Sequence, residues 1–210
     1  MSPPGAARGS ARSPNEPPTS PFGGGASPFV CRVAQTDGER AAYFALRREI
    51  FCDEQRLFAG SDRDAIDEAA VPVICLAPPS GETGAAGRVV GVVRVWEEAP
   101  GDWLGGRLGV ETEHRTVGAI GKWLIQMAVG SARAWGAWRF RATVQRPNVP
   151  LFRRLHWHTC AELDVHGQPH HLMEADLTRY LRTAELRPGG ARVSPAIRGF
   201  GEELRPSDAA

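Results

Sequence analysis

RLGVETEHRTVGAIGKWLI, residues 107–125, is the stretch of this chain that decides the fold. A β-rich segment ends at Val110, a polar connection follows, and small residues from Gly118 to Gly121 open a segment with helical periodicity. The first N–H groups of such a helix have no partner within it, and the helix dipole adds positive potential there. The pattern predicts a site for an anion such as a pyrophosphate, although a helix start that needs small residues only for packing would look the same.

Charge and composition limit what else the chain can bind. The net charge is only +1 over 210 residues, so an anion site must be local, and Arg115 and Lys122 bracket the turn where it would form. The basic segment 146–154 beside Trp157 could suggest nucleic-acid contact, but the neutral total charge argues against it. We therefore expect neither a nucleic-acid partner nor a membrane partner.

The chain is expected to contain one folded domain between two tails. Residues 1–28 are rich in Pro, Gly, Ala and Ser and predict a disordered leader, while residues 183–210 predict a flexible tail. The domain spans residues 29–182. No apolar run approaches the roughly 20 residues that cross a bilayer, and the four cysteines are scattered as free thiols would be, which favours a cytoplasmic protein.

Hydrophobic periodicity gives the expected order of elements within the domain. A helix is predicted from Arg40, with Asp37 as its N-cap, and the polar segment Asp62–Ala69 is predicted to be a loop or short helix. Strands are expected at 29–35, 71–77, 88–96, 103–110, 140–145, 161–166 and 171–177, and further helices at 119–135 and 149–156. This order predicts an α+β, three-layer αβα fold: a central mixed, mostly antiparallel sheet of six or seven strands flanked by about four helices.

Three segments resemble one known family. Residues 107–125 are similar to the acetyl-CoA motif of the GNAT superfamily, although one extra residue follows Arg115 and Ala119 replaces a glycine. LRREIFCDEQ (Leu46–Gln55) resembles ElaA-like acetyltransferases. RFRATVQRPNVPLFRRLHW, followed by GQPHHLMEADL, resembles a bacterial N-acyltransferase subfamily associated with nitrogen-starvation gene clusters.

The resemblance implies the GNAT fold and transfer of an acyl group from acetyl-CoA, or another acyl-CoA, to a small-molecule amine. It implies an oxyanion-binding backbone N–H at Val110 and acceptor contacts from Phe51, Gln55 and His171. The residues expected to bind the acyl-CoA are Leu108, Gly109, Val110, Arg115, Thr116, Val117, Gly118, Ala119, Ile120, Gly121, Lys122, Gln145, Asn148 and Phe152. Asn148 could equally be a plain helix cap.

The reaction needs proton transfers, because an alkylamine is neutral in only about one molecule per thousand at pH 7. Glu54 is the first choice as base, with Glu111 and Glu113 as alternatives, and a capping or salt-bridge role for Glu54 stays open. Phe152 stands where related enzymes have a tyrosine acid. We therefore expect His170, or else His156 or water, to protonate the thiolate.

A metal is not expected, although five of the six histidines lie between His156 and His171 with Cys160 among them. His156 and His158 bracket Trp157, and His170 and His171 should point to opposite faces of a strand. The acidic run of residues 62–68 hints at a cationic acceptor, but a solvated face is the preferred interpretation. A non-catalytic acyl-CoA sensor, an acyl-homoserine-lactone-synthase-like enzyme and a homodimer remain open.

Overall fold

The computed structural model describes residues 28–79, 87–165 and 167–183. The expected leader and tail lie outside these ranges except at their boundary residues, so the predictions for them are not tested. No helix within the described ranges is long and apolar enough to cross a membrane.

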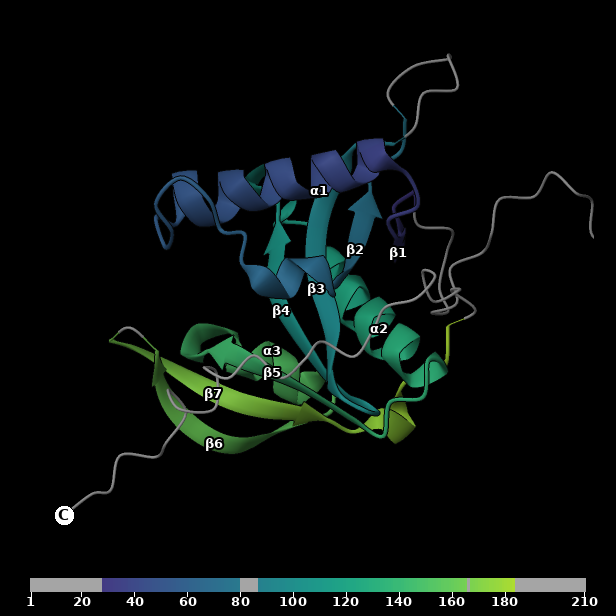
Figure 1. Cartoon of the computed structure of the whole chain (residues 1–210), viewed down its shortest axis with the longest axis vertical. Helices are drawn as coiled ribbons and strands as arrows, with labels where there is room; N and C mark the ends of the chain where they lie inside the picture. Colours follow the sequence, from purple (N-terminus) through teal and green to yellow (C-terminus); the bar gives the residue numbers. More distant parts are fainter. Residues whose placement is uncertain (1–27, 80–86, 166, 184–210) are drawn as a thin grey trace, which may run out of the picture.

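The described residues form one sheet of seven strands in the order β1-β2-β3-β4-β5-β7-β6 (Figure 1). Every neighbouring pair is antiparallel except β4 and β5, which are parallel. The strands are β1 (Val30–Val33), β2 (Val71–Leu76), β3 (Val89–Ala99), β4 (Asp102–Val110), β5 (Arg139–Gln145), β6 (Trp157–Val165) and β7 (Gln168–Ala175). The predicted mixed, mostly antiparallel sheet is confirmed.

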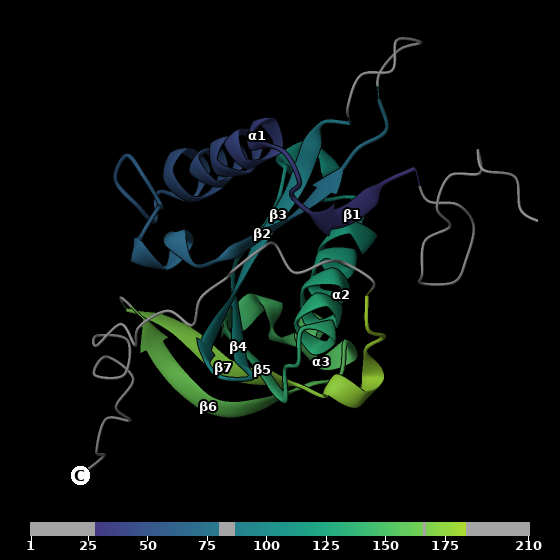
Figure 2. The same ribbon diagram turned by 45° about the vertical axis from the view of Figure 1, so that its right-hand side comes forward.

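Helices cover both faces of this sheet, as the prediction of three layers requires. Helix α1 (Asp37–Arg48) lies on one face of β2 and β3, and α2 (Ala119–Ala134) lies on the other (Figure 2). The short helix α3 (Val149–Arg154) shares the α2 side, because its buried residues join the same core cluster. The described residues hold three α-helices, where about four helices were expected. They also hold the π-helix η1 (Glu49–Glu54) and the short 3₁₀ helices η2 (Ala65–Glu68), η3 (Thr112–His114), η4 (Arg146–Asn148) and η5 (Leu177–Arg179).

Several predicted boundaries were wrong. Helix α1 begins at Asp37 rather than Arg40, because Thr36 is the N-cap and forms a reciprocal capping box with Glu39. Strand β6 begins at Trp157 rather than Ala161, since Trp157 packs into the core, 4% exposed. The helix predicted to run to His156 accordingly stops at Arg154.

The parallel strands β4 and β5 separate part of the way along the sheet. Only residues Asp102–Gly105 of β4 pair with β5, at Arg139–Ala142, whereas β4 continues along β3 as far as Val110. A bulge lies at the point of separation. Gly106 pairs with Arg94 and Gly109 with Val92, so two residues of β4 lie opposite one residue of β3. Beyond Gly105, one edge of β4 therefore faces a gap that no described strand fills.

Candidate functional site

The gap between β4 and β5 exposes backbone groups that a sheet would normally pair. The Glu111 N–H donates to the Val90 carbonyl of β3 at 2.9 Å. Because successive residues of a strand point their amides to opposite edges, the Val110 and Leu108 amides are directed to the gap. The resemblance implied an oxyanion-binding N–H at Val110, and it included Leu108 among the residues expected to bind acyl-CoA.

The start of helix α2 opens beside the same gap. A Cβ added at Gly118 or Gly121 would meet no atom within 4 Å, so the backbone there is open to a ligand. Among the described residues, the amides of Gly118, Ala119 and Gly121 donate to no backbone carbonyl, while the Ile120 amide donates to the Val117 carbonyl at 3.1 Å. Free amides together with the helix dipole fit the predicted anion site.

Arg115 is held between this turn and the segment that follows α1. Its Nε donates to the Val110 carbonyl at 2.9 Å, and its two terminal nitrogens contact the Glu54 carboxylate at 2.5 and 2.7 Å. The Thr112 hydroxyl donates to the same carboxylate at 3.1 Å. The structure thus brings together Glu54, Arg115 and Val110, three residues that the sequence analysis assigned to one site.

The ion pair changes what Glu54 can do. The hydrogen bonds from Arg115 are the main reason why the pKa of the Glu54 carboxyl lies below its usual value, and the Thr112 bond adds to this effect. A carboxylate that holds its charge so firmly is a weaker proton acceptor than a base with a pKa near 7. The geometry is better suited to positioning Arg115 than to deprotonating an amine.

The other residues expected to contact acyl-CoA differ in their exposure. Gln145 and Asn148 are exposed at the end of β5, and the Asn148 side chain makes no cap bond to α3. Lys122 and Thr116 are exposed on the turn, whereas the Ile120 side chain is wholly buried in the core. Phe152 is only 6% exposed and packs edge-on against Trp157, which leaves little of its ring for a ligand.

A cleft of about 590 Å³ lies at the far end of β5. It is lined by Leu57, Gln145, Arg146 and His170, together with three prolines and Gln168. Gln145 and His170 are directly paired across β5 and β7, so they share one face of the sheet. Gln145 and His170 were expected from the sequence. Leu57, Arg146 and Gln168 were not expected in this cleft, because no local pattern distinguishes them from ordinary surface residues.

His171 and the remaining acceptor candidates lie outside this cleft. The His171 ring is 3.2 Å from the Thr159 hydroxyl and lines a second cleft of about 470 Å³, which His170 also borders. Phe51 is 7% exposed in the core beneath β4, and Gln55 is exposed at the end of η1. Of the predicted residues, His170 lines the 590 Å³ cleft, whereas Phe51 and His171 do not.

Neither tyrosine is placed to protonate a leaving thiolate. The buried Tyr180 hydroxyl donates to the Leu155 carbonyl at 2.5 Å and accepts a bond from the Trp157 indole at 2.8 Å. Tyr43 is 1% exposed and accepts a bond from Arg47. Burial is the main reason why the pKa of each tyrosine is raised to about 12, so neither hydroxyl readily releases a proton.

The acidic run after η1 is not a solvated face, and that prediction was wrong. Asp62 is 2% exposed and contacts Arg47 at 2.7 Å. Three arginines from α1, β3 and β4 pair with three aspartates: Arg47, Arg94 and Arg107 with Asp62, Asp64 and Asp67. These charges balance one another, so they offer no net attraction for a cationic acceptor.

Comparisons with known proteins bear on the fold. No protein-family model matches the sequence, and no curated protein matches it significantly. A candidate N-acetyltransferase from Lactobacillus plantarum superposes with a TM-score of 0.62 at 18% identity, covering 72% of this chain and 99% of that one. ElaA from Escherichia coli gives 0.58 at 15% identity, covering 70% and 99%. BjaI, a CoA-dependent acyl-homoserine lactone synthase solved with SAM and isopentyl-CoA, gives 0.54 at 19% identity, covering 65% and 74%.

Proposed function

We propose, on the premise that this chain has the GNAT fold, that it is an acyltransferase that moves an acyl group from acyl-CoA to a small-molecule amine. One observation carries the proposal: the gap between β4 and β5 opens beside the unblocked start of α2. A diphosphate needs free backbone amides to bind its charge, and the extended arm attached to it needs an unpaired strand edge to bond its own amide groups. The start of α2 would provide the first and the edge of β4 the second.

Each part of the site has a role in this proposal. The amides of Gly118, Ala119 and Gly121 would receive the diphosphate, and Arg115 would add a charge-assisted bond. The Leu108 and Val110 edge of β4 would pair with the pantetheine arm. The Val110 N–H would then lie where negative charge develops on the thioester oxygen, which is the kind of contact that accelerates acyl transfer.

The chemical step is direct attack by the amine. The amine nitrogen forms a bond to the thioester carbon, the carbon–sulfur bond breaks, and the thiolate takes up a proton while the new amide loses one. Since a thiolate has a pKa of about 8.5, water can protonate it, and His170, which lines the cleft, is the candidate side-chain acid. The cleft lined by Leu57, Gln145, Arg146 and His170 is the proposed acceptor site.

A thiol-release screen tests the proposal. The full chain is mixed with acetyl-CoA or longer acyl-CoAs and with amines, polyamines, amino acids or aminoglycosides, and free CoA thiol is measured. We expect release that depends on both the acyl donor and one class of amine. Tight acyl-CoA binding without release for any amine would favour a sensor, and a failure to bind acyl-CoA would overturn the proposal.

The likeness to BjaI supports a second candidate, an enzyme that acylates S-adenosylmethionine. In the same screen, S-adenosylmethionine and medium-length or branched acyl-CoAs form a separate arm. Release of methylthioadenosine along with free thiol would favour this reading, whereas release with simple amines alone would exclude it. We place either enzyme in the cytoplasm, since all four cysteines are free thiols.

A further inference from the structure

One face of the sheet formed by β5, β7 and β6 is polar and lies away from α2 and α3. Phe140, Met173 and Trp157 point into the core that contains those helices. Their chain neighbours Arg141, Glu174 and His158 therefore point to the opposite face. These three are directly paired in the ladder, Arg141 with Glu174 and Glu174 with His158, so they form one row across the strands.

A bulge in β6 adds a fourth polar side chain to this row. Thr159 pairs with Met173 and Ala161 with Leu172, which leaves Cys160 as the extra residue between them. Bulges of this kind redirect a side chain out of the regular alternation. Here the ligand atoms of His158, Cys160 and Glu174 all lie within 4.8 Å of one another, with His158 and Cys160 exposed and Glu174 half-buried.

We propose that His158, Cys160 and Glu174 form a binding site for a divalent transition-metal ion of the zinc type. A thiolate, an imidazole and a carboxylate are the ligands that Zn²⁺ takes in proteins, at about 2.0–2.3 Å. Three protein ligands leave a fourth tetrahedral position, which would face solvent and hold water. Ligand atoms up to 4.8 Å apart need to approach by only about 1 Å for such bonds, and the bulged Cys160 is not held by a ladder pair.

The charges around the cluster tolerate a cation. Arg139 and Arg141 are the nearby positive groups, and both are engaged by Asp102, at 3.0 Å and 2.8 Å respectively. Asp102 offsets part of their charge, so they oppose a bound cation less than unpaired arginines would.

A second cluster near the phosphate turn is a weaker candidate. Glu111, Glu113 and His114 also lie within 4.8 Å of one another. Glu111, however, is already paired with Arg88 and lies 2.7 Å from the His114 ring. No metal was expected from the sequence because the histidines alone diverge, and only the strand pairing places Glu174 beside His158.

Cobalt titration of the full chain tests the site. Co²⁺ bound to a thiolate gives a near-ultraviolet charge-transfer band, which we expect to saturate at one ion per chain and to disappear when Zn²⁺ is added. Cys160→Ser should abolish the band, and His158→Gln and Glu174→Gln should each weaken Co²⁺ binding at least tenfold. Zn²⁺ should raise the melting temperature of the wild type but not of Cys160→Ser.

Matched variants separate this site from the alternatives. Cys31→Ser removes another partly exposed thiol, and His114→Gln removes the second cluster; both should keep the band and the Co²⁺ affinity. Circular dichroism checks that every variant is folded. Absence of the band in the wild type, its persistence in Cys160→Ser, or its loss in either control would overturn the proposal.

Discussion

Glu54 shows how a neighbour decides the role of a residue. Without a charged partner it would be a reasonable base, which is how the sequence presents it. In the folded chain its carboxylate carries two bonds from Arg115 and one from Thr112. These bonds stabilise the ionised form and thereby lower the pKa of the carboxyl, so we assign Glu54 to positioning Arg115.

The variant Glu54→Gln tests this assignment. Because Arg115 loses its charged partner and its fixed orientation, we expect the KM for acyl-CoA to rise by up to about fivefold, the equivalent of about 1 kcal/mol for an exposed ion pair. The pH profile of kcat should keep its shape. Steady-state kinetics from pH 6 to 9 measure both quantities.

Asp53→Asn is the matched control, since it removes one negative charge from the adjacent exposed residue of η1. It should leave the KM for acyl-CoA unchanged. If Glu54→Gln instead lowered kcat at pH 7 and regained activity as the pH rose, Glu54 would be the base after all.

At the scale of the element, the start of helix α2 is the proposed anion site. Its N-terminal turn has no acidic residue and no side-chain cap, so its dipole and its amides are available to a ligand. This differs from α1, whose first turn is closed by the Thr36–Glu39 capping box. The capped start of α1 therefore serves as an internal control for anion binding at the uncapped start of α2.

The variant Gly121→Asp should weaken acyl-CoA binding about tenfold or more, since like charges a few ångströms apart cost about 1–4 kcal/mol near a protein surface. The new side chain enters open space, so the fold should be retained. Gly38→Asp places the same side chain in the first turn of α1 and should leave binding unchanged. Calorimetric titration with CoA measures the effect; equal affinities in the two variants would rule out the turn as the anion site.

The start of α2 was predictable, and the start of β6 was not. Small residues followed by apolar side chains at helical spacing identify Ala119, and Gly136 adopts a φ of 101° just after the helix, a position where glycine commonly ends helices. The segment 157–160 lacks alternating polarity, and its strand state depends on Trp157 filling a core space that only the tertiary structure creates. The Glu54–Arg115 pair joins residues 61 positions apart, beyond any local pattern.

At the scale of the whole molecule, the buried ionic network connects the first helix to the sheet. Arg47 is fully buried and bonds Asp62 and Asp67, which lie 15 and 20 residues along the chain. The sequence suggested a solvated acidic face because each aspartate looks unpaired locally. Their partners come from α1, β3 and β4, and only folding brings them together.

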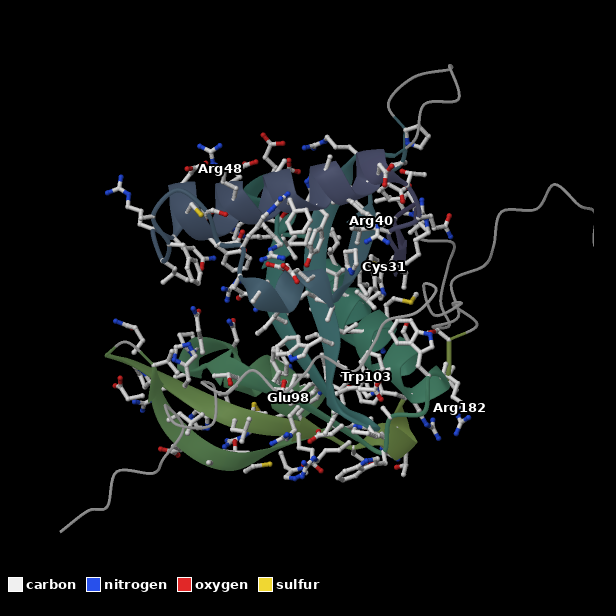
Figure 3. The ribbon with its side chains drawn as sticks, in the orientation of Figure 1. Cys31, Arg40, Arg48, Glu98, Trp103 and Arg182 are labelled. Carbon is white, nitrogen blue, oxygen red and sulfur yellow. The ribbon has the colours of Figure 1, made fainter. Side chains whose placement is uncertain are left out.

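The variant Arg47→Met should lower the free energy of unfolding by about 3–5 kcal/mol, because it leaves Asp62 and Asp67 buried without their main partner. Arg48→Met is the control, since Arg48 lies on the outer side of the same helix (Figure 3). Urea denaturation should show little change for that variant. Similar losses in both variants, or in neither, would contradict the role given to the network.

The network also predicts an acid dependence. Burial alone would raise the pKa of Asp67, but the bonds from Arg47 and the charge of Arg94 outweigh burial and lower it below 3.8. Its ionisation therefore contributes stability above about pH 3.8, and this contribution is lost as the pH falls further. Arg47→Met should lose less stability than the wild type between pH 5 and 3.

The short contact between β4 and β5 has a mechanical consequence. Only four residue pairs join the two strands, so the sheet consists of two parts, β1 to β4 and β5 to β6, with a short connection between them. A molecule lying in the gap would bond to both parts of the sheet and extend their connection beyond the last β4–β5 pair. Binding of a ligand in the gap should then slow amide hydrogen exchange in β4 and in β5 together, because the two parts of the sheet would move as one rigid unit.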